Sequence, residues 1–331
     1  MFDLLIKGGY VVTPLGSANL DIGIQGEKIA AISDPNQLPE QGARIVDASG
    51  KLVIPGGVEP HAHAGDSMTP ERAPAREVSL AAIWGGTTTV MDFAQMPPET
   101  DLIQAIEISK ERWVQNAYTD YSFHPIIRGG ASADVIAQIG QTIANGFATI
   151  KIFTTSIRPP LGPRPSNFID FGRLGEIMTE VEAQGGMMFI HAEDEDEVMY
   201  NYHMAESRNQ LEWHNMHLIH NNISEDLSFR RVIRLAESKG VAVYFVHVSA
   251  KEGVNAVAEA RQQNLPIYGE TLHNYVSFNA ENYKEENGMK YHTYPSLKSE
   301  DDRLKLWEGL LNGDLSTIAT DVVATSWEEK I

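Results

Sequence analysis

The chain has 331 residues, with 26 basic and 45 acidic side chains, a formal net charge of −19 and no cysteine. This charge disfavours nucleic acid and anionic membranes as partners, because both bind through basic patches. The missing thiols exclude a disulfide scaffold, a thiolate metal site and a cysteine nucleophile. Neither a signal-peptide pattern nor an apolar run of membrane-spanning length is visible, so we expect a soluble, cytoplasmic protein.

The first part of the chain predicts a small β unit. Short β-type runs at residues 4–6, 10–12, 22–24, 28–32 and 44–46 are separated by glycine and proline. We expect residues 1–51 to form a small antiparallel unit, too small to bury a good core by itself.

From residue 52 onward, strand-like and helix-like segments alternate. The predicted strands cover residues 52–54, 87–93, 121–127, 148–153, 187–191, 242–248, 266–271 and 316–321. The predicted helices cover residues 74–84, 101–113, 133–144, 173–184, 226–239, 253–263 and 301–311. This order predicts an α/β fold, a (β/α)8 TIM barrel over residues 52–331. A doubly wound sheet is the rival, but the chain has no Gly-x-Gly-x-x-Gly fingerprint. The chain stops soon after the eighth strand, so we expect its closing helix to be missing or truncated.

Polar residues at the predicted strand ends are the candidate site residues, because such barrels carry their active sites there. They are His61, His63, Lys151, His191, His247 and Asp321. Each has an ordinary explanation when taken singly: a strand-end histidine is often a core residue, and Asp321 could cap a helix. Their common position at one rim favours a metal site, and the alternation of strand side chains lets His61 and His63 share one ion.

Lys151 is unusual because it lies within an apolar strand. Burial beside cations disfavours an ammonium group, and a neutral amine can add carbon dioxide to become a carbamate. A carbamate is an anionic ligand with two oxygens, so it could bridge two cations. Four histidines, one aspartate and this group describe a binuclear site that suits Zn²⁺, with Mn²⁺ or Co²⁺ as alternatives.

This constellation resembles the amidohydrolase superfamily, and within it the dihydropyrimidinase/D-hydantoinase-like cyclic amidases. The resembling segments are residues 3–9, 53–63, 85–89, 151–153, 191–193, 246–252 and 319–321. The resemblance implies that His61, His63, Lys151 and Asp321 hold one metal. It implies that Lys151, His191 and His247 hold the other. It also implies that residues 1–51 belong to a β-sandwich, normally completed by a C-terminal segment absent here, and that the chain forms a homo-oligomer, a dimer or tetramer.

The function implied is a hydrolase acting on C–N bonds other than peptide bonds, which opens a cyclic amide such as a hydantoin, dihydropyrimidine or related ureide. A metal-bridging hydroxide would attack, since metal binding lowers the pKa of water to ~7. Asp321 would act as general base and then as general acid. The alternatives are a non-catalytic dihydropyrimidinase-like scaffold and an inactive truncated chain.

Three positions depart from the family pattern. Ser156 stands where these enzymes commonly have a tyrosine that binds the oxyanion, and serine is too short to reach as far. Residues 294–298, Tyr-Pro-Ser-Leu-Lys, replace Ser-Pro-Pro-Leu-Arg, and Val322 replaces a histidine. We therefore take Ser156, Tyr294 and His273 as candidate substrate residues and expect substrate positioning to be rebuilt.

Three further features have weaker interpretations. His214, His217 and His220 recur every third residue and could share one helix face, although a polar face is the simpler reading. The acidic run at residues 193–197 is typical of a solvated helix start. Residues 159–163 suggest a rigid loop over the barrel mouth.

Overall fold

The computed structural model describes residues 1–66, 68–159, 166–326 and 328. The chain forms two compact units, Met1–Gly57 and Val58–Ile331. The predicted domain boundary after residue 51 lies a few residues before this division. Most of the predicted loop at 159–163 lies outside the described residues, as do residues 327 and 329–331, so the missing or truncated closing helix stays a prediction. No described helix is long and apolar enough to cross a membrane.

The first unit is one five-stranded sheet in the order β3-β2-β1-β4, with β5 also paired to β1. Its strands are β1 (Leu4–Thr13), β2 (Gly16–Gln25), β3 (Lys28–Ser33), β4 (Arg44–Asp47) and β5 (Leu52–Val53). β1 is antiparallel to β2 but parallel to β4 and β5, so the prediction of an antiparallel unit was wrong. The predicted runs at 4–6 and 10–12 are one strand, whose register shifts between Ile6 and Gly9.

The assignment of residues 52–54 to the barrel was also wrong. Leu52 and Val53 pair with Tyr10 and Val11 in the first unit. Gly9 permits this approach, because a Cβ there would lie 2.5 Å from Val53 Cγ2. The first barrel strand is β6 (Gly57–Glu59) instead.

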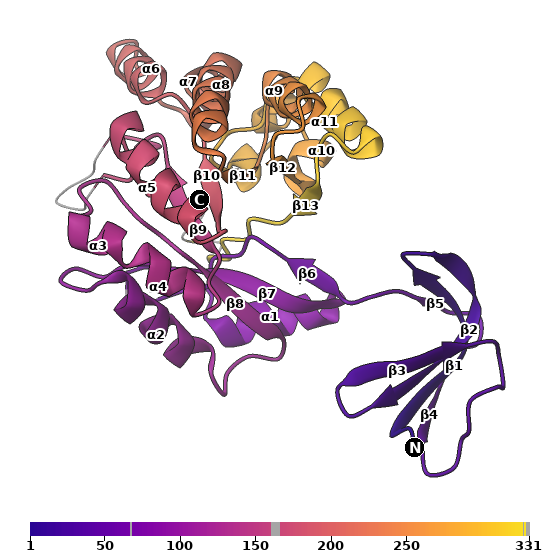
Figure 1. Cartoon of the computed structure of the whole chain (residues 1–331). Coiled ribbons are helices and arrows are strands. Elements are labelled where there is room, and N and C mark those ends of the chain that lie inside the picture. The colour runs from indigo at the N-terminus through magenta and orange to yellow at the C-terminus, as the bar shows by residue number, and fades with distance from the viewer. Residues whose placement is uncertain (67, 160–165, 327, 329–331) are drawn as a thin grey trace. The chain divides into compact units, whose positions relative to one another are not determined.

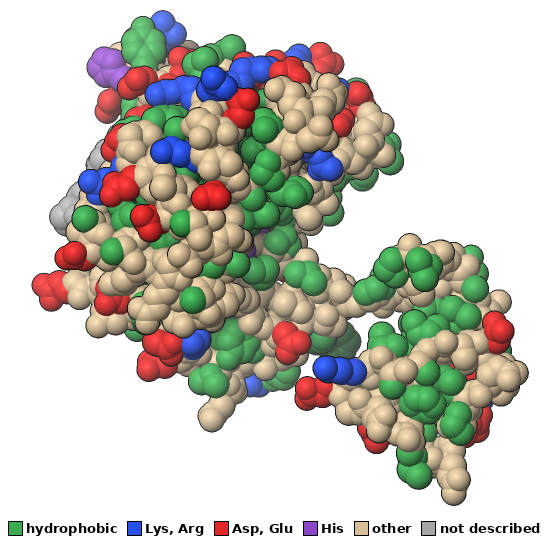
Figure 2. Space-filling view, in the orientation of Figure 1, with side chains coloured by type: hydrophobic (Ala, Val, Ile, Leu, Met, Phe, Trp, Pro, Cys, Tyr) green, Lys and Arg blue, Asp and Glu red, His purple; other side chains and the backbone are tan. Residues whose placement is uncertain are grey.

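The first unit exposes much of its apolar surface. Ile29 and Leu52 are each 62% exposed, and Ile45 is 48% exposed. Figure 2 shows hydrophobic side chains gathered over this sheet. A single sheet has no second layer to cover such side chains, as expected for so small a unit.

The second unit contains the eight barrel strands and confirms the predicted (β/α)8 barrel. They are β6 (Gly57–Glu59), β7 (Thr87–Ala94), β8 (Asp120–Pro125), β9 (Thr149–Phe153), β10 (Met187–His191), β11 (Ala242–Phe245), β12 (Ile267–Leu272) and β13 (Thr317–Ala319). They form one run β6-β7-β8 and a second run β9 to β13. Parallel bridges between Ile126 and Lys151, and between Ala62 and Val322, join the two runs at both seams.

Glu59 strengthens the seam between the first and last strands. Its carboxylate accepts hydrogen bonds from His61 N at 2.9 Å and from Thr320 N at 3.2 and 3.1 Å. Burial raises the pKa of Glu59, and these hydrogen bonds oppose the shift. The residues that follow the first and last strands are therefore held side by side.

Helices connect successive strands along the chain and lie around the outside of the barrel (Figure 1). The helices that match predicted segments are α1 (Ala75–Trp84), α2 (Leu102–Trp113), α3 (Ala133–Ala137), α4 (Ile139–Ala144), α5 (Phe171–Ala183), α8 (Asn222–Lys239), α9 (Lys251–Gln262) and α11 (Glu300–Asn312). The predicted helix at 133–144 is divided at Gln138 into α3 and α4. Three further α-helices of the described residues lie outside the predicted helix ranges. They are α6 (Glu195–Ser207), whose start the acidic run at 193–197 indicated, α7 (Met216–Ile219), within the run of histidines, and α10 (His273–Ser277).

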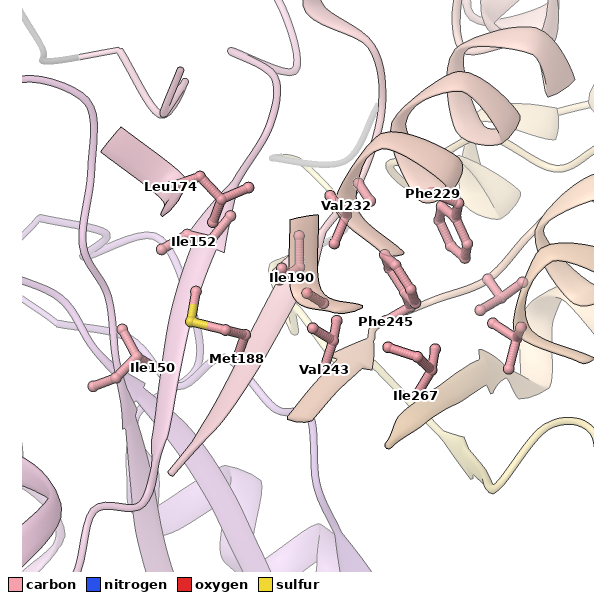
Figure 3. Packing of buried hydrophobic residues seen from close by; sticks show 14 of the residues in the cluster. Ile150, Ile152, Leu174, Met188, Ile190, Phe229, Val232, Val243, Phe245 and Ile267 are labelled. Carbon is pink, nitrogen blue, oxygen red and sulfur yellow. The ribbon is translucent and has the colours of Figure 1, made fainter. Parts of the chain in front are cut away.

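The core between barrel and helices explains how Lys151 is oriented. Ile150 and Ile152 are fully buried and pack in one cluster with Met188 of β10 and Leu174 of α5 (Figure 3). Side chains alternate along a strand, so Lys151 points the opposite way, into the barrel interior. The outward packing of β9 therefore places a lysine inside the barrel.

Candidate metal centre

The six candidate ligands all lie in or just after barrel strands. His61 and His63 follow β6, Lys151 is within β9, His191 ends β10, and His247 and Asp321 come two residues after β11 and β13. Five strands thus deliver these side chains to one end of the barrel.

His61, His63 and Asp321 form a tight group. Asp321 Oδ1 lies 3.1 Å from His61 Nε2 and 3.1 Å from His63 Nε2. One ligand atom from each of the three residues can be chosen so that all lie within 4.8 Å of one another. Two imidazole nitrogens facing one carboxylate oxygen repel it unless a proton or a cation lies between them. The group therefore has the geometry and donor chemistry of a possible metal site.

His247 connects this group to His191. The ring centroids of His247 and His61 are 5.6 Å apart, and those of His247 and His191 are 4.4 Å apart. Burial lowers the pKa of all three imidazoles of His63, His191 and His247, that of His63 to about 4. Neutral imidazoles are the form that binds metals.

Lys151 is a buried amine without a hydrogen-bond partner among the described residues. Its Nζ lies 4.7 to 5.6 Å from the ring centroids of Phe93, Phe153 and Phe189. Burial lowers the pKa of Lys151 to about 7, although the charges of Asp321 and Glu270 oppose the shift. A buried amine without a hydrogen-bond partner in the described residues needs an explanation. A ligand bound at the amine, or a chemical group added to it, would provide one.

Asp321 is held as a carboxylate. Burial alone would raise its pKa, but His61, His63 and Lys151 outweigh burial and lower the pKa to about 2. The Asp321 side chain is 10% exposed and that of His63 18%, whereas His61 is 1% exposed. The cluster is therefore accessible from the side of Asp321 and His63.

Two of the candidate ligands have strained backbone. The φ angles are 42° at His247 and 48° at Asp321, in the left-handed region that residues with side chains rarely adopt. Such strain persists only where the surrounding structure imposes it, and it concentrates at functional sites.

Two buried glutamates contact the cluster, and neither role was among the sequence predictions. Glu270 Oε1 is 2.8 Å from His61 Nδ1, and Glu193 Oε2 is 2.8 Å from His191 Nε2. The prediction that the run at 193–197 is solvated is wrong for Glu193 and Asp194, which are both buried. The available signals were a glutamate inside the apolar strand β12 and an acid two residues after a candidate ligand.

The three histidines at third-residue spacing do not share a site. His217 Nδ1 lies 3.0 Å from the backbone oxygen of His214. His220 is buried, with Nδ1 2.8 Å from Glu193 Oε1 and Nε2 3.2 Å from Tyr202 Oη. His220 therefore belongs to the surroundings of His191 rather than to a helix-face metal site.

The candidate substrate residue Ser156 lies between two polar partners. Its Oγ is 2.7 Å from Glu195 Oε1 and 2.7 Å from Ser166 Oγ, and its N–H donates to Glu195 Oε2 at 2.6 Å. In this arrangement the Ser156 hydroxyl is hydrogen-bonded to Glu195, the first residue of α6.

The other two candidate substrate residues lie in different surroundings. The ring centroid of Tyr294 is 5.0 Å from that of His220, which links the 294–298 segment to Glu193. His273 is the first residue of α10 and its side chain is exposed. Their contact with a substrate stays a prediction.

Known proteins resemble the chain over almost its whole length. The D-hydantoinase of Streptomyces coelicolor is 29% identical over 329 residues, covering 96% of this chain and 68% of the relative. That of Geobacillus stearothermophilus is 30% identical, covering 96% of this chain and 66% of the relative. No protein-family model matches the chain.

Solved structures agree with the sequence relatives. A D-hydantoinase crystal structure superimposes with a TM-score of 0.90 at 28% identity, covering 98% of this chain and 70% of the other. The dihydropyrimidinase of Brevibacillus agri gives 0.89 at 27% identity, covering 98% and 69%.

The barrel and the cluster at its strand ends define an amidohydrolase-type α/β barrel. Within that class, the chain belongs to the hydantoinase/dihydropyrimidinase family of cyclic amidases. It spans about two thirds of the length of the curated relatives that it matches.

Proposed function

We propose that this chain is a metal-dependent hydrolase that opens a cyclic amide: a hydantoin, a dihydropyrimidine or a related ureide. The observation that carries the proposal is the convergence of His61, His63 and Asp321 near the buried Lys151, whose amine has no hydrogen-bond partner in the described part of the chain. The family membership and the names of its relatives, D-hydantoinase and dihydropyrimidinase, support the substrate class.

The proposed ligands form two subsites. The first subsite takes His61, His63 and Asp321, the second takes His191 and His247, and Lys151, as a carbamate, contributes to both. Nitrogen and oxygen donors without thiolate suit Zn²⁺, with Mn²⁺ or Co²⁺ as alternatives. When bound, two such cations would acidify water and polarise the substrate carbonyl.

The chain's own residues would handle the proton. Asp321 is ionised at neutral pH because the neighbouring imidazoles and Lys151 lower its pKa. It can therefore accept a proton from the nucleophile and return it to the departing amide nitrogen. Its partial exposure, with that of His63, provides the side from which a substrate would approach.

The test combines metal analysis with a substrate panel. We expect the purified 331-residue chain, produced with zinc and bicarbonate, to contain about two equivalents of metal. It should open hydantoins, dihydropyrimidines or allantoin-like ureides and leave linear carbamoyl compounds unchanged. Folded protein with no metal and no ring opening would contradict the proposal and favour the scaffold alternative.

A Ser156→Ala variant separates two roles for that hydroxyl. Loss of an oxyanion donor would lower kcat by about 10²–10³-fold. Because the hydroxyl is bonded to Glu195 and Ser166, we expect instead a loss of about 1 kcal/mol in unfolding free energy with kcat nearly unchanged. Urea unfolding and steady-state kinetics on the same preparation measure both quantities. A large fall in kcat would assign the oxyanion role to Ser156.

A further inference from the structure

Two buried carboxylates face imidazoles of different proposed subsites. Glu270 of β12 contacts His61, and Glu193, just after β10, contacts His191, each at 2.8 Å. Both carboxylates are fully buried. A buried carboxylate requires such donors, because water does not reach it.

These contacts place an N–H on the ring nitrogen that faces each glutamate. A neutral imidazole has one N–H and one lone pair, and a carboxylate only accepts hydrogen bonds. His61 therefore donates through Nδ1 to Glu270, and its Nε2, which faces Asp321, is the nitrogen that can exchange a proton for a cation. His191 donates through Nε2 to Glu193, which leaves the lone pair on Nδ1.

Nε2 of His61 lies where a cation would need a ligand atom. His61 Nε2 is the atom that lies 3.1 Å from Asp321 Oδ1, within the first subsite. The opposite tautomer would direct an N–H at that subsite and remove one ligand. The carboxylate of Glu270 thus selects the ligand atom of His61.

Both glutamates are themselves held in place. Glu270 Oε2 accepts from Tyr244 Oη at 2.9 Å, and its Oε1 accepts from His247 N at 3.2 Å. Glu193 N donates to Thr154 Oγ1 at 3.1 Å. The second oxygen of Glu193 is taken by the buried His220, as described above. Turning Glu270 away from His61 would break its bonds to Tyr244 and His247 N, and turning Glu193 away from His191 would break its bond to His220.

We propose that Glu270 and Glu193 are positioning residues, one for each metal subsite. Glu270 holds His61 with Nε2 toward His63 and Asp321. Glu193 holds His191 with Nδ1 available to the subsite of His247. This inference rests on the proposed function, because it assumes that the cluster binds two cations.

The test is a Co²⁺ titration of the metal-free protein, followed by visible absorption and by competition with a chelator. We expect Glu270→Gln and Glu193→Gln each to lower the affinity for one of the two cations by about 10–100-fold, since loss of the hydrogen-bond partner of a metal-binding imidazole changes metal affinity by this amount. Asp302→Asn is the matched control: Asp302 is a buried carboxylate that accepts hydrogen bonds from Asn222 and the N–H of Lys251, and among the described residues no imidazole is hydrogen-bonded to it.

Double variants assign each glutamate to its subsite. In a His63→Asn background the first subsite has already lost a ligand, so Glu270→Gln should add little further loss, whereas Glu193→Gln should weaken the remaining cation. Equal additional losses from both glutamates would overturn the assignment to separate subsites.

A measurement on the unaltered protein keeps the inference testable if a variant fails to fold. Imidazole ¹⁵N NMR of the metal-free protein should show a proton on Nδ1 of His61, with or without a second proton on the Nε2 that faces Asp321, and a proton on Nε2 of His191. A His61 without the Nδ1 proton, or a His191 without the Nε2 proton, would overturn the inference. If the wild type binds two cations and both variants match its affinities, only this inference fails. If the wild type binds none, the proposed function fails with it.

Discussion

Replacing Lys151 with methionine should abolish activity while making the metal-free protein more stable. The buried amine has no hydrogen-bond partner among the described residues, and a buried polar group without a partner costs about 1–3 kcal/mol. Methionine has a similar length, and its sulfur packs well against the neighbouring rings of Phe93, Phe153 and Phe189. We expect the unfolding free energy of metal-free Lys151→Met to rise by about that amount in urea titrations under carbon dioxide-free buffer.

The same change should remove the bridging ligand. We expect the metal content to fall from about two equivalents to about one or less. Ring opening should fall by about 10³-fold or more, because the cations are what make water acidic enough to attack at neutral pH. A Lys151→Met variant with full metal content and activity would contradict the bridging-carbamate proposal.

Lys298→Met is the matched control for stability. Lys298 is also a buried lysine, but its Nζ donates to Ser296 O at 3.3 Å and it interacts with Glu225. Removing this partnered amine should lower stability and leave the metal content unchanged. If both lysine variants shifted stability in the same direction, burial alone rather than the missing partner would explain the effect.

The pH dependence of the Lys151 effect has a defined sign. The pKa of Lys151 is about 7 in the folded metal-free protein, against 10.5 for an unperturbed lysine. Between these values the unfolded chain binds more protons than the folded one, so the contribution of Lys151 to stability rises with pH. The stability difference between wild type and Lys151→Met should therefore be largest below pH 7 and shrink toward pH 10.5.

The sequence predicts the barrel and the convergence of candidate ligands because both depend on short-range patterns. An apolar run such as residues 187–191 specifies a buried strand, and a histidine at its end falls at the rim of any such barrel. Lys151 stands out in the same way, as a cation within an apolar strand. These signals need no knowledge of which strands are neighbours.

The errors come from long-range pairing, which the local pattern does not encode. Residues 52–54 have a stronger apolar run than Gly57–Glu59, yet Leu52 and Val53 pair with β1 of the first unit. The contact between His61 and Glu270 joins residues 209 positions apart, so Glu270 has no local partner that reveals its role. Glu193 was misread for a related reason: an acidic run is usually solvated, and only His191 and His220 make its burial tolerable.

Replacing Asp321 with asparagine should produce the second large loss of activity. The neighbouring imidazoles and Lys151 lower the pKa of Asp321, so its side chain is an ionised carboxylate at neutral pH and can accept a proton, which an asparagine at this position cannot do. Asparagine keeps an oxygen of similar position but has no basic group, and loss of a general base costs about 10²–10⁴-fold in kcat. We expect Asp321→Asn to lower kcat by this amount with a smaller change in KM, measured at saturating metal concentration.

Glu59→Gln shows whether that loss reflects proton transfer or the geometry of the strand ends. Glu59 is a carboxylate that braces the same seam through His61 N and Thr320 N, and glutamine keeps an accepting oxygen. We expect this variant to retain kcat within about tenfold, because these backbone N–H groups need an acceptor and not a base. Equal losses in Glu59→Gln and Asp321→Asn would mean that Asp321 acts by shaping the cluster. A selective loss in Asp321→Asn with unchanged metal content would assign proton transfer to Asp321, since both carboxylates hold the same pair of strand ends. A selective loss together with lower metal content would assign the loss to metal binding by Asp321.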